Sequence, residues 1–146
     1  MKGYLLDTNV LIALLWPSHT AHASAVRWFV RHRAKRWATC PLTEAGFVHI
    51  VSNPAFSRDA VTPREAASLL AANTAANDHE FWPCALSFAD AAVFAGPRLV
   101  GHQQVTDAYL LGLALKRGGM LATFDERIVA LTLAKSAERR ALELLA

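Results

Sequence analysis

The stretch YLLDTNVLIALL, residues 4–15, predicts a buried strand that turns directly into a helix. Its first three residues form a short apolar run of the kind found in fully buried strands, and the run ends at Asp7. Val10 to Leu15 is apolar again and follows Thr8 and Asn9, two residue types that commonly cap a helix. A short strand joined to a helix in this way is the repeating unit of parallel α/β sheets.

The rest of the chain continues this alternation between apolar runs and amphipathic segments. We expect strands over residues 37–40, 81–85 and 120–124, and helices over residues 21–36, 43–53, 62–76 and 106–117. Thr43, Thr62 and Thr106 are the expected N-caps of the last three helices. The tail from Ser136 fits either a closing strand or a helix. These segments predict a single α/β domain over residues 1–146 with a central parallel sheet.

The composition agrees with a folded domain. The 146 residues are 53% hydrophobic and only 18% charged, which excludes a disordered tail or an acidic linker. This apolar composition predicts hydrophobic surface reserved for a partner, and the segments Val10–Leu15 and Phe47–Val51 are the candidates for it. No apolar stretch reaches the length of a membrane span, and Cys40 and Cys84 lack metal-site spacing. We therefore expect two free thiols and a cytoplasmic protein without membrane contact.

The net charge of +3 is concentrated in one part of the sequence. Residues 27–36 hold five basic residues and no acidic one, whereas the remainder of the chain is slightly acidic. Arg27, Arg31 and Lys35 recur at helical spacing and predict a basic stripe on one helix face. Such a stripe either follows an RNA backbone or is a solvated face, and the sequence leaves both open.

Four carboxylates stand where α/β proteins place their ligand sites. Asp7 and Asp125 follow apolar strands, and Glu44 and Asp107 lie one residue after a candidate capping threonine. Strand ends and the following helix starts share one edge of a parallel sheet, so the four side chains are expected to converge. Clustered carboxylates repel, and oxygen ligands favour a hard cation, Mg²⁺ or Mn²⁺. The alternative is that each acid only caps a helix or a turn, or interacts with a helix dipole.

Four ordered segments, LLDTNVLIALL, PLTEAGFVHI, VTDAYLLGLALKRGG and LATFDERI, resemble those of PIN-domain proteins. More specifically, the chain resembles the VapC-type ribonuclease toxins of type II toxin–antitoxin systems over nearly its whole length. The resemblance implies a three-layer α/β/α sandwich and a Mg²⁺-dependent endoribonuclease that hydrolyses RNA phosphodiester bonds. It also implies a VapB-type antitoxin that neutralises the enzyme, and a toxin homodimer.

The same resemblance assigns catalytic and metal-binding roles to the four acids. Asp7 matches the first metal-binding aspartate of the family, and Glu44 matches its acidic residue on the third helix. Asp107 matches the metal-binding aspartate of the TDAYL segment, and Asp125 the aspartate that follows the last of the four strands. Two alternatives remain: a catalytically silent PIN-like RNA-binding module, and a flavodoxin-like binding domain whose acids only cap helices. Titration with a metal ion separates both from a nuclease.

Overall fold

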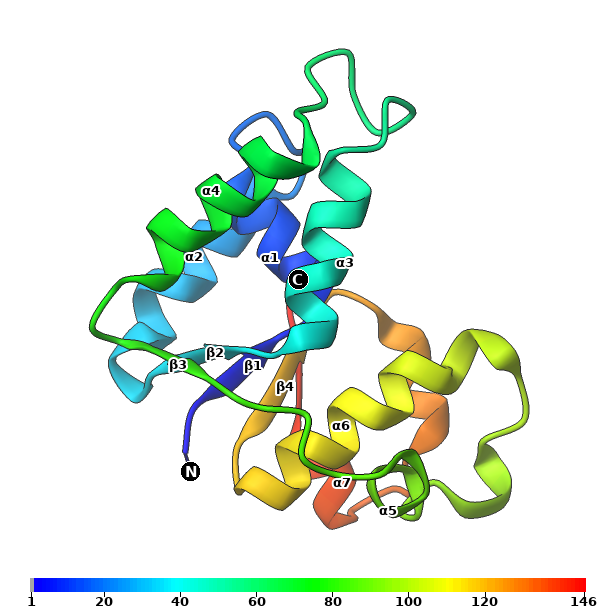
Figure 1. The fold of residues 1–146 in the computed structure, drawn as a ribbon. Coiled ribbons are helices and arrows are strands. Elements are labelled where there is room, and N and C mark those ends of the chain that lie inside the picture. Colours follow the sequence, from blue (N-terminus) through cyan, green and yellow to red (C-terminus); the bar gives the residue numbers. More distant parts are fainter. Residues whose placement is uncertain (1) are drawn as a thin grey trace.

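The computed structural model describes residues 2–146 and contains a five-stranded parallel sheet with the order β3-β2-β1-β4-β5 (Figure 1). The strands are β1 (Tyr4–Leu6), β2 (Trp37–Thr39), β3 (His79–Phe81), β4 (Met120–Thr123) and β5 (Leu142–Leu144). β1 lies in the centre, between β2 and β4, and all four neighbouring pairs are parallel. The predicted α/β class with a parallel sheet is confirmed.

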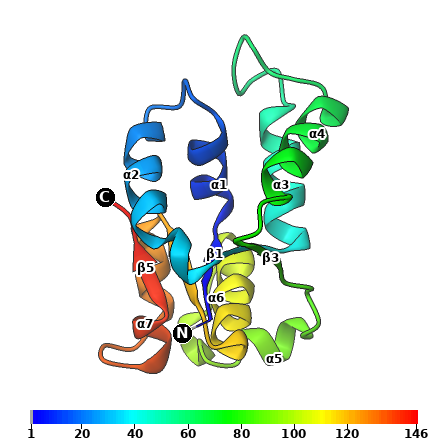
Figure 2. The ribbon, with the colours of Figure 1, turned by 90° about the vertical axis from the view of Figure 1, so that its left-hand side faces the viewer.

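Helices cover both faces of this sheet, which makes a three-layer sandwich (Figure 1 and Figure 2). The helices are α1 (Thr8–Leu15), α2 (His22–His32), α3 (Pro41–Val51), α4 (Pro63–Thr74), α5 (Phe88–Ala92), α6 (Val105–Arg117) and α7 (Ala137–Arg140). Short 3₁₀ turns complete the connections: η1 (Arg33–Lys35), η2 (Gly96–Arg98), η3 (His102–Gln104) and η4 (Glu126–Leu131). The first four helices lie on one face, and α5, α6 and α7 on the other.

Alternating side chains of the strands supply two separate hydrophobic cores. Leu5 of β1 packs with α6, whereas Tyr4 and Leu6 on the same strand pack with the helices of the opposite face. Leu121 and Ala122 of β4 divide in the same way. Since successive side chains of a strand point to opposite faces, three residues suffice to hold β1 between two helical layers. The buried YLL run of the sequence therefore has a direct structural explanation.

A close approach between two helices shapes the carboxyl edge of the sheet. α3 packs against α1 so tightly that a Cβ atom at Gly46 would lie 2.7 Å from Thr8 Oγ1. Only glycine allows this contact without a shift of the Thr8 side chain or of one helix. Glu44 stands two residues before it, so the contact determines where that carboxylate lies relative to the start of α1.

Most of the N-caps differ from those expected. Asp7 caps α1, which begins at Thr8, because the Asp7 carboxylate accepts a hydrogen bond from the Thr8 amide. α3 begins at Pro41, where the missing N–H of proline costs nothing in the first turn, so Thr43 lies inside the helix. Thr106 likewise lies within α6. The predicted N-cap at Thr62 is confirmed, and Thr62 forms a capping box with Glu65.

Some element boundaries also differ. The basic segment does not form one helix, since α2 ends at His32 and η1 follows, with Arg36 at a positive φ of 73°. This turn redirects the chain into β2. The third strand is His79–Phe81, not residues 81–85, since the run FWPCA contains Pro83, which cannot donate a ladder hydrogen bond.

The tail contains both elements that the sequence left open. α7 comes first, and β5 then pairs with β4 and completes the sheet. Of the two segments expected to form a partner surface, Val10–Leu15 is largely buried, with Val10 to Ala13 in the core. Phe47–Val51 is mixed, since Phe47 and Val51 are buried whereas His49 and Ile50 are exposed. Both cysteines are free, Cys40 buried and Cys84 partly exposed. Within the described part of the chain, none of the helices has the length and apolar character that crossing a membrane requires.

Candidate active site

Asp7 is the most deeply placed of the four acids. It follows β1, is only 6% exposed and lies at the N-terminus of α1. Its Oδ1 accepts a hydrogen bond from the Thr8 amide at 2.7 Å, and its Oδ2 accepts one from the Thr123 hydroxyl at 2.8 Å. The carboxylate is thus held from two directions, by its own helix and by the neighbouring strand β4.

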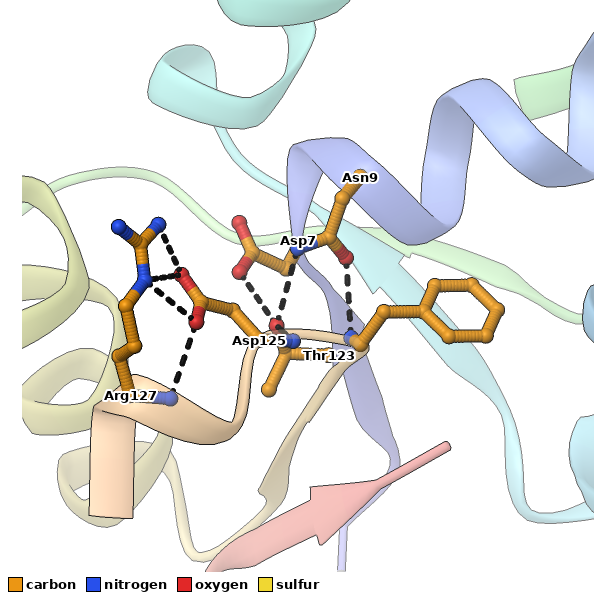
Figure 3. A network of polar contacts seen from close by, with 6 residues as sticks. Asp7, Asn9, Thr123, Asp125 and Arg127 are labelled. Atoms are coloured by element: carbon orange, nitrogen blue, oxygen red, sulfur yellow. Dashed lines mark hydrogen bonds and ion pairs between the residues drawn. The ribbon is translucent and has the colours of Figure 1, made fainter. Parts of the chain in front are cut away.

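Thr123 connects the ends of β1 and β4 (Figure 3). Its Oγ1 donates to Asp7 and accepts from Asn9 Nδ2 at 3.1 Å and from the Asp125 amide at 3.0 Å. One donor and two acceptor positions are all that a hydroxyl offers, so this group is fully used. Asn9 Oδ1 in turn accepts from the Phe124 amide at 3.1 Å. The network fixes the chain that leads from β4 to Asp125.

Three of the four predicted carboxylates share one cavity. This cavity has a volume of about 340 Å³ and includes Asp7, Asp107 and Asp125 in its wall. Its remaining lining residues are Thr8, Asn9, Ile12, His19, Ile50 and Phe56. Asp107 comes from the first turn of α6, and the other two acids follow β1 and β4. The sheet edge therefore brings together residues that are a hundred positions apart in sequence, as expected.

The carboxylates of the cavity influence one another. Burial, followed by repulsion from Asp7 and Asp125, raises the pKa of Asp107 to about 7. Burial also raises the pKa of Asp7 and outweighs the two hydrogen bonds that its carboxylate accepts. Two acids in one cavity therefore resist ionisation, and a cation placed between them would remove that penalty.

Asp125 is in a different electrostatic state. Arg127 pairs with it through Nη2, 2.8 Å from Oδ2, and through Nε, 2.9 Å from Oδ1 (Figure 3). The same carboxylate accepts a hydrogen bond from the Arg127 amide and so caps η4. This guanidinium holds the pKa of Asp125 below its ordinary value. Asp125 is therefore ionised, whereas burial favours the neutral forms of Asp7 and Asp107 in the same cavity.

Glu44 lies outside this cavity. Its Oε2 accepts a hydrogen bond of 2.6 Å from the hydroxyl of Thr39 at the end of β2, and that hydroxyl also contacts His79 Nε2 at 2.8 Å. Glu44 instead lines a neighbouring groove of about 770 Å³ between α3 and α4. The hydrogen bond from Thr39 thus accounts for the separation of Glu44 from the three aspartates.

The donor set fits a hard divalent cation in part. The acidic groups in the cavity wall are carboxylates, and the raised pKa values of Asp7 and Asp107 indicate that the negative charge of these two lacks full compensation. Among residues 2–146, however, no three His, Cys, Asp or Glu side chains are close enough to hold an ion together. Mg²⁺ commonly takes one or two carboxylates and keeps several waters, so this arrangement suits it better than an ion that needs a closed cage.

Capping, the alternative role that the sequence left open for these acids, is also present, since Asp7 caps α1 and Asp125 caps η4. Capping and ligand binding use different oxygen lone pairs, and both aspartates still line the cavity. Sequence reasoning missed Asn9 and Arg127 as partners of the acids, although both lie two residues from one of them. It also missed the aromatic wall at Phe56.

The predicted basic stripe is divided by the turn at the end of α2. Arg27 and Arg31 are exposed on α2, whereas Lys35 belongs to η1 and lines another cavity. The stripe is therefore shorter than expected, and Lys35 faces a different part of the surface.

Comparison with known proteins agrees with this architecture. A family model of the PIN domain matches residues 4–133. Ribonuclease VapC39 of Mycobacterium tuberculosis is 45% identical over 121 residues, which cover 83% of this chain and 87% of the relative. Ribonuclease VapC38 of the same organism is 44% identical over 141 residues, which cover 97% and 96%.

Solved structures share the fold at lower identity. M. tuberculosis VapC20, described as a sarcin–ricin loop cleaving toxin, has a TM-score of 0.64 at 18% identity and covers 92% of this chain and 98% of its own. A chain of the Rickettsia felis VapBC2 complex, bound to a DNA fragment from its promoter, has a TM-score of 0.59 at 15% identity and covers 98% of each. The chain therefore belongs to the PIN domain family and, within it, to the VapC-type proteins.

Proposed function

We propose that this protein is a Mg²⁺-dependent endoribonuclease toxin whose active site is the cavity of Asp7, Asp107 and Asp125. The observation that carries the proposal is the convergence of these carboxylates, two with raised pKa values, in one cavity at the carboxyl edge of the sheet. The relatives named ribonucleases, at 41–45% identity, support RNA as the substrate. A catalytically silent RNA-binding module would have no need for uncompensated acids.

The roles of the acids follow from their surroundings. Asp7 and Asp107 would hold the Mg²⁺, because their pKa values are raised and a positive charge would stabilise their ionised forms most. Arg127 attracts Asp107 only weakly, since burial and repulsion from the other two acids outweigh its effect. When bound, the ion neutralises phosphate oxygens and lowers the pKa of a coordinated water. Asp125 stays ionised beside Arg127 and would accept hydrogen bonds from a water bound in the cavity. Glu44 approaches the RNA from the adjoining groove.

The precision of the site depends on groups that touch neither metal nor RNA. Thr123 fixes the rotamer of Asp7 and the backbone at Asp125 together, so two acids from different strands keep one relative position. Asn9 adds a second link between α1 and the segment after β4. Catalysis by positioning tolerates little displacement of such groups.

Sequencing of RNA ends tests the nuclease proposal. RNA from cells that express the wild-type protein is expected to carry new ends at defined positions, and RNA from cells that express Asp7→Asn is expected to lack them. RNA that binds the protein without acquiring new ends would support the silent binding module instead.

Both cysteines are free, which supports the further proposal of a cytoplasmic location.

We also propose a VapB-type antitoxin as partner. The groove between α3 and α4 offers it an apolar surface, with Val48, Leu70 and Phe81 among its lining residues and Glu44 beside them. The solved VapBC2 complex of a protein with this fold supports the idea. A basic side chain of such a segment would enter the acidic cavity and compete with Mg²⁺. Co-expression with the neighbouring small gene, followed by size-exclusion chromatography and an RNase assay, tests binding, inhibition and the proposed homodimer together.

A further inference from the structure

A second polar cavity, of about 580 Å³, lies at the opposite edge of the sheet from the aspartates. Its lining residues are Lys2, Lys35, Arg36, Glu80, Lys116 and Arg117. Most of them stand just before a strand begins: they lead into β1, β2 and β4. Asp7 and Asp125, by contrast, follow β1 and β4. Figure 2 shows β1 running from the N-terminus, at this edge, to the start of α1 at the other.

Two arginines form a fixed frame around the single acid of this basic cavity. Arg117 Nη2 lies 2.7 Å from Glu80 Oε1, and Arg36 Nε lies 3.5 Å from Glu80 Oε2. Arg36 also donates to the backbone carbonyls of Asn77 and His79. The guanidinium of Arg117 stacks over Trp82, 5.1 Å from the ring centroid. Glu80 and the backbone thus hold both arginines in place, but one carboxylate neutralises only one of their charges.

The three lysines of the basic cavity have no such partner. Within residues 2–146, the ammonium groups of Lys2, Lys35 and Lys116 make no hydrogen bond or ion pair with the protein. Five cations therefore surround one carboxylate, and four positive charges remain uncompensated. A cavity lined by one sign of charge concentrates ligands of the opposite sign. Its volume lies within the range of small-ligand sites, large enough for one or two phosphate groups.

We propose that this basic cavity binds backbone phosphates of the RNA substrate, away from the cleavage site. The inference rests on the proposed nuclease function only in identifying the RNA as substrate. Lysine ammonium groups bind phosphates as point charges and carry no base specificity. Because the cavity and the aspartates lie at opposite edges of the sheet, an RNA that fills both must pass around the molecule. The basic cavity therefore favours long or folded RNA over short oligonucleotides.

Salt-dependent RNA binding tests the proposal. A labelled folded RNA is titrated in the cleavage-deficient Asp7→Asn background without divalent metal, and the affinity is followed by fluorescence anisotropy over a salt series. Adding Lys35→Gln and Lys116→Gln is expected to reduce the slope of log K against log salt by about 1.4 to 1.8, because each lost phosphate contact contributes about 0.7 to 0.9. The matched control adds Arg64→Gln and Lys135→Gln, two exposed positions outside the cavity. An equal reduction in both pairs, or none in the first, overturns the proposal.

Two further measurements are needed. One distinguishes RNA from a free nucleotide as the ligand of the basic cavity, and the other distinguishes failure of this proposal from failure of the nuclease proposal. If a nucleoside triphosphate binds the Asp7→Asn protein but not its Lys35→Gln/Lys116→Gln derivative, while the lysine changes leave the salt slope of RNA binding unchanged, the cavity is a nucleotide site and the RNA assignment is wrong. With Asp7 intact, the Lys35→Gln/Lys116→Gln changes are expected to raise the KM for folded RNA several-fold more than the KM for a tetranucleotide, and equal increases for both RNAs would contradict a contact away from the cleavage site. If no RNA is cleaved by any variant, the nuclease proposal fails, whereas the salt slope still decides whether the cavity binds RNA.

Discussion

The hydroxyl of Thr123 donates a hydrogen bond to the buried carboxylate of Asp7, with Oγ1 2.8 Å from Oδ2. This contact joins the ends of the two central strands, β1 and β4. Since Thr123 also accepts hydrogen bonds from Asn9 and from the Asp125 amide, one side chain positions both strand-end acids. The geometry of the cavity therefore depends on a residue that is itself completely buried.

Removing this hydroxyl is expected to destabilise the protein and impair the site. Thr123→Val keeps the shape but leaves polar atoms of Asp7, Asn9 and Asp125 without a partner. An unsatisfied buried group costs about 1–3 kcal/mol, so the free energy of unfolding in urea should fall by at least that amount. Thr123→Ser, which keeps the hydroxyl, is the control and should lose less. Equal losses in both variants would mean that only packing matters at this position.

The stability of the metal-free protein should depend on pH through Asp107. Its pKa of about 7 lies above the ordinary value of 3.8, so between these values the native state binds more protons than the unfolded chain. The free energy of unfolding should therefore fall as the pH rises from about 4 to about 7. The raised pKa of Asp7 acts in the same direction. Thermal unfolding in EDTA across this range measures the effect.

Asp107→Asn should flatten that profile, because the group that takes up the proton is gone. Mg²⁺ should raise the Tm of the wild type more at about pH 8 than at about pH 5, where protons compete for the same carboxylates. Parallel pH profiles for wild type and variant would contradict the assignment of the raised pKa to Asp107.

Glu44 should contribute less to cation binding than Asp7. Its carboxylate accepts a short hydrogen bond from Thr39 and lines the groove instead of the aspartate cavity. Glu44→Gln and Asp7→Asn are matched isosteric changes, and the first should retain most of the Tm increase caused by Mg²⁺. If both variants lose it equally, Glu44 must leave Thr39 and join the ion when the ion binds.

The exposed arginines of α2 give a separate prediction about RNA. Arg27 and Arg31 make no side-chain hydrogen bond or ion pair within the described chain, so both are available to phosphates. Arg27→Gln combined with Arg31→Gln should lower the salt slope of single-stranded RNA binding by about 1.4. An unchanged slope would identify this face of α2 as merely solvated.

The fold was predictable where local signals and burial agree. Asp7 follows the YLL run directly and Asp125 follows the MLAT run after Phe124. Both runs consist of residues that only a buried strand explains, and both are strands. The edge strand β3 was placed too late because its residues His79, Glu80 and Phe81 are partly exposed and lack an apolar signal. The apolar run that follows them contains Pro83 and packs as a loop.

The candidate site was predictable only where the topology of the sheet determines the position of a residue. Asp7, Asp107 and Asp125 could be grouped because parallel topology alone brings strand ends and helix starts to one edge. The displacement of Glu44 depends on Thr39, a contact between neighbouring elements that no spacing rule contains. The burial of α1 and of Phe47 depends on the close packing at Gly46, which sequence patterns do not report.

Cleavage of RNA during a Mg²⁺ titration tests the central claim most directly. Purified wild-type protein in excess EDTA should leave RNA intact, and Mg²⁺ should restore cleavage in a saturable manner. Asp7→Asn and Asp107→Asn should each reduce the rate by orders of magnitude at every Mg²⁺ concentration while the proteins remain folded. Full cleavage in EDTA, or an Asp7→Asn protein as active as the wild type, would contradict the assignment of this cavity as a metal-dependent nuclease site.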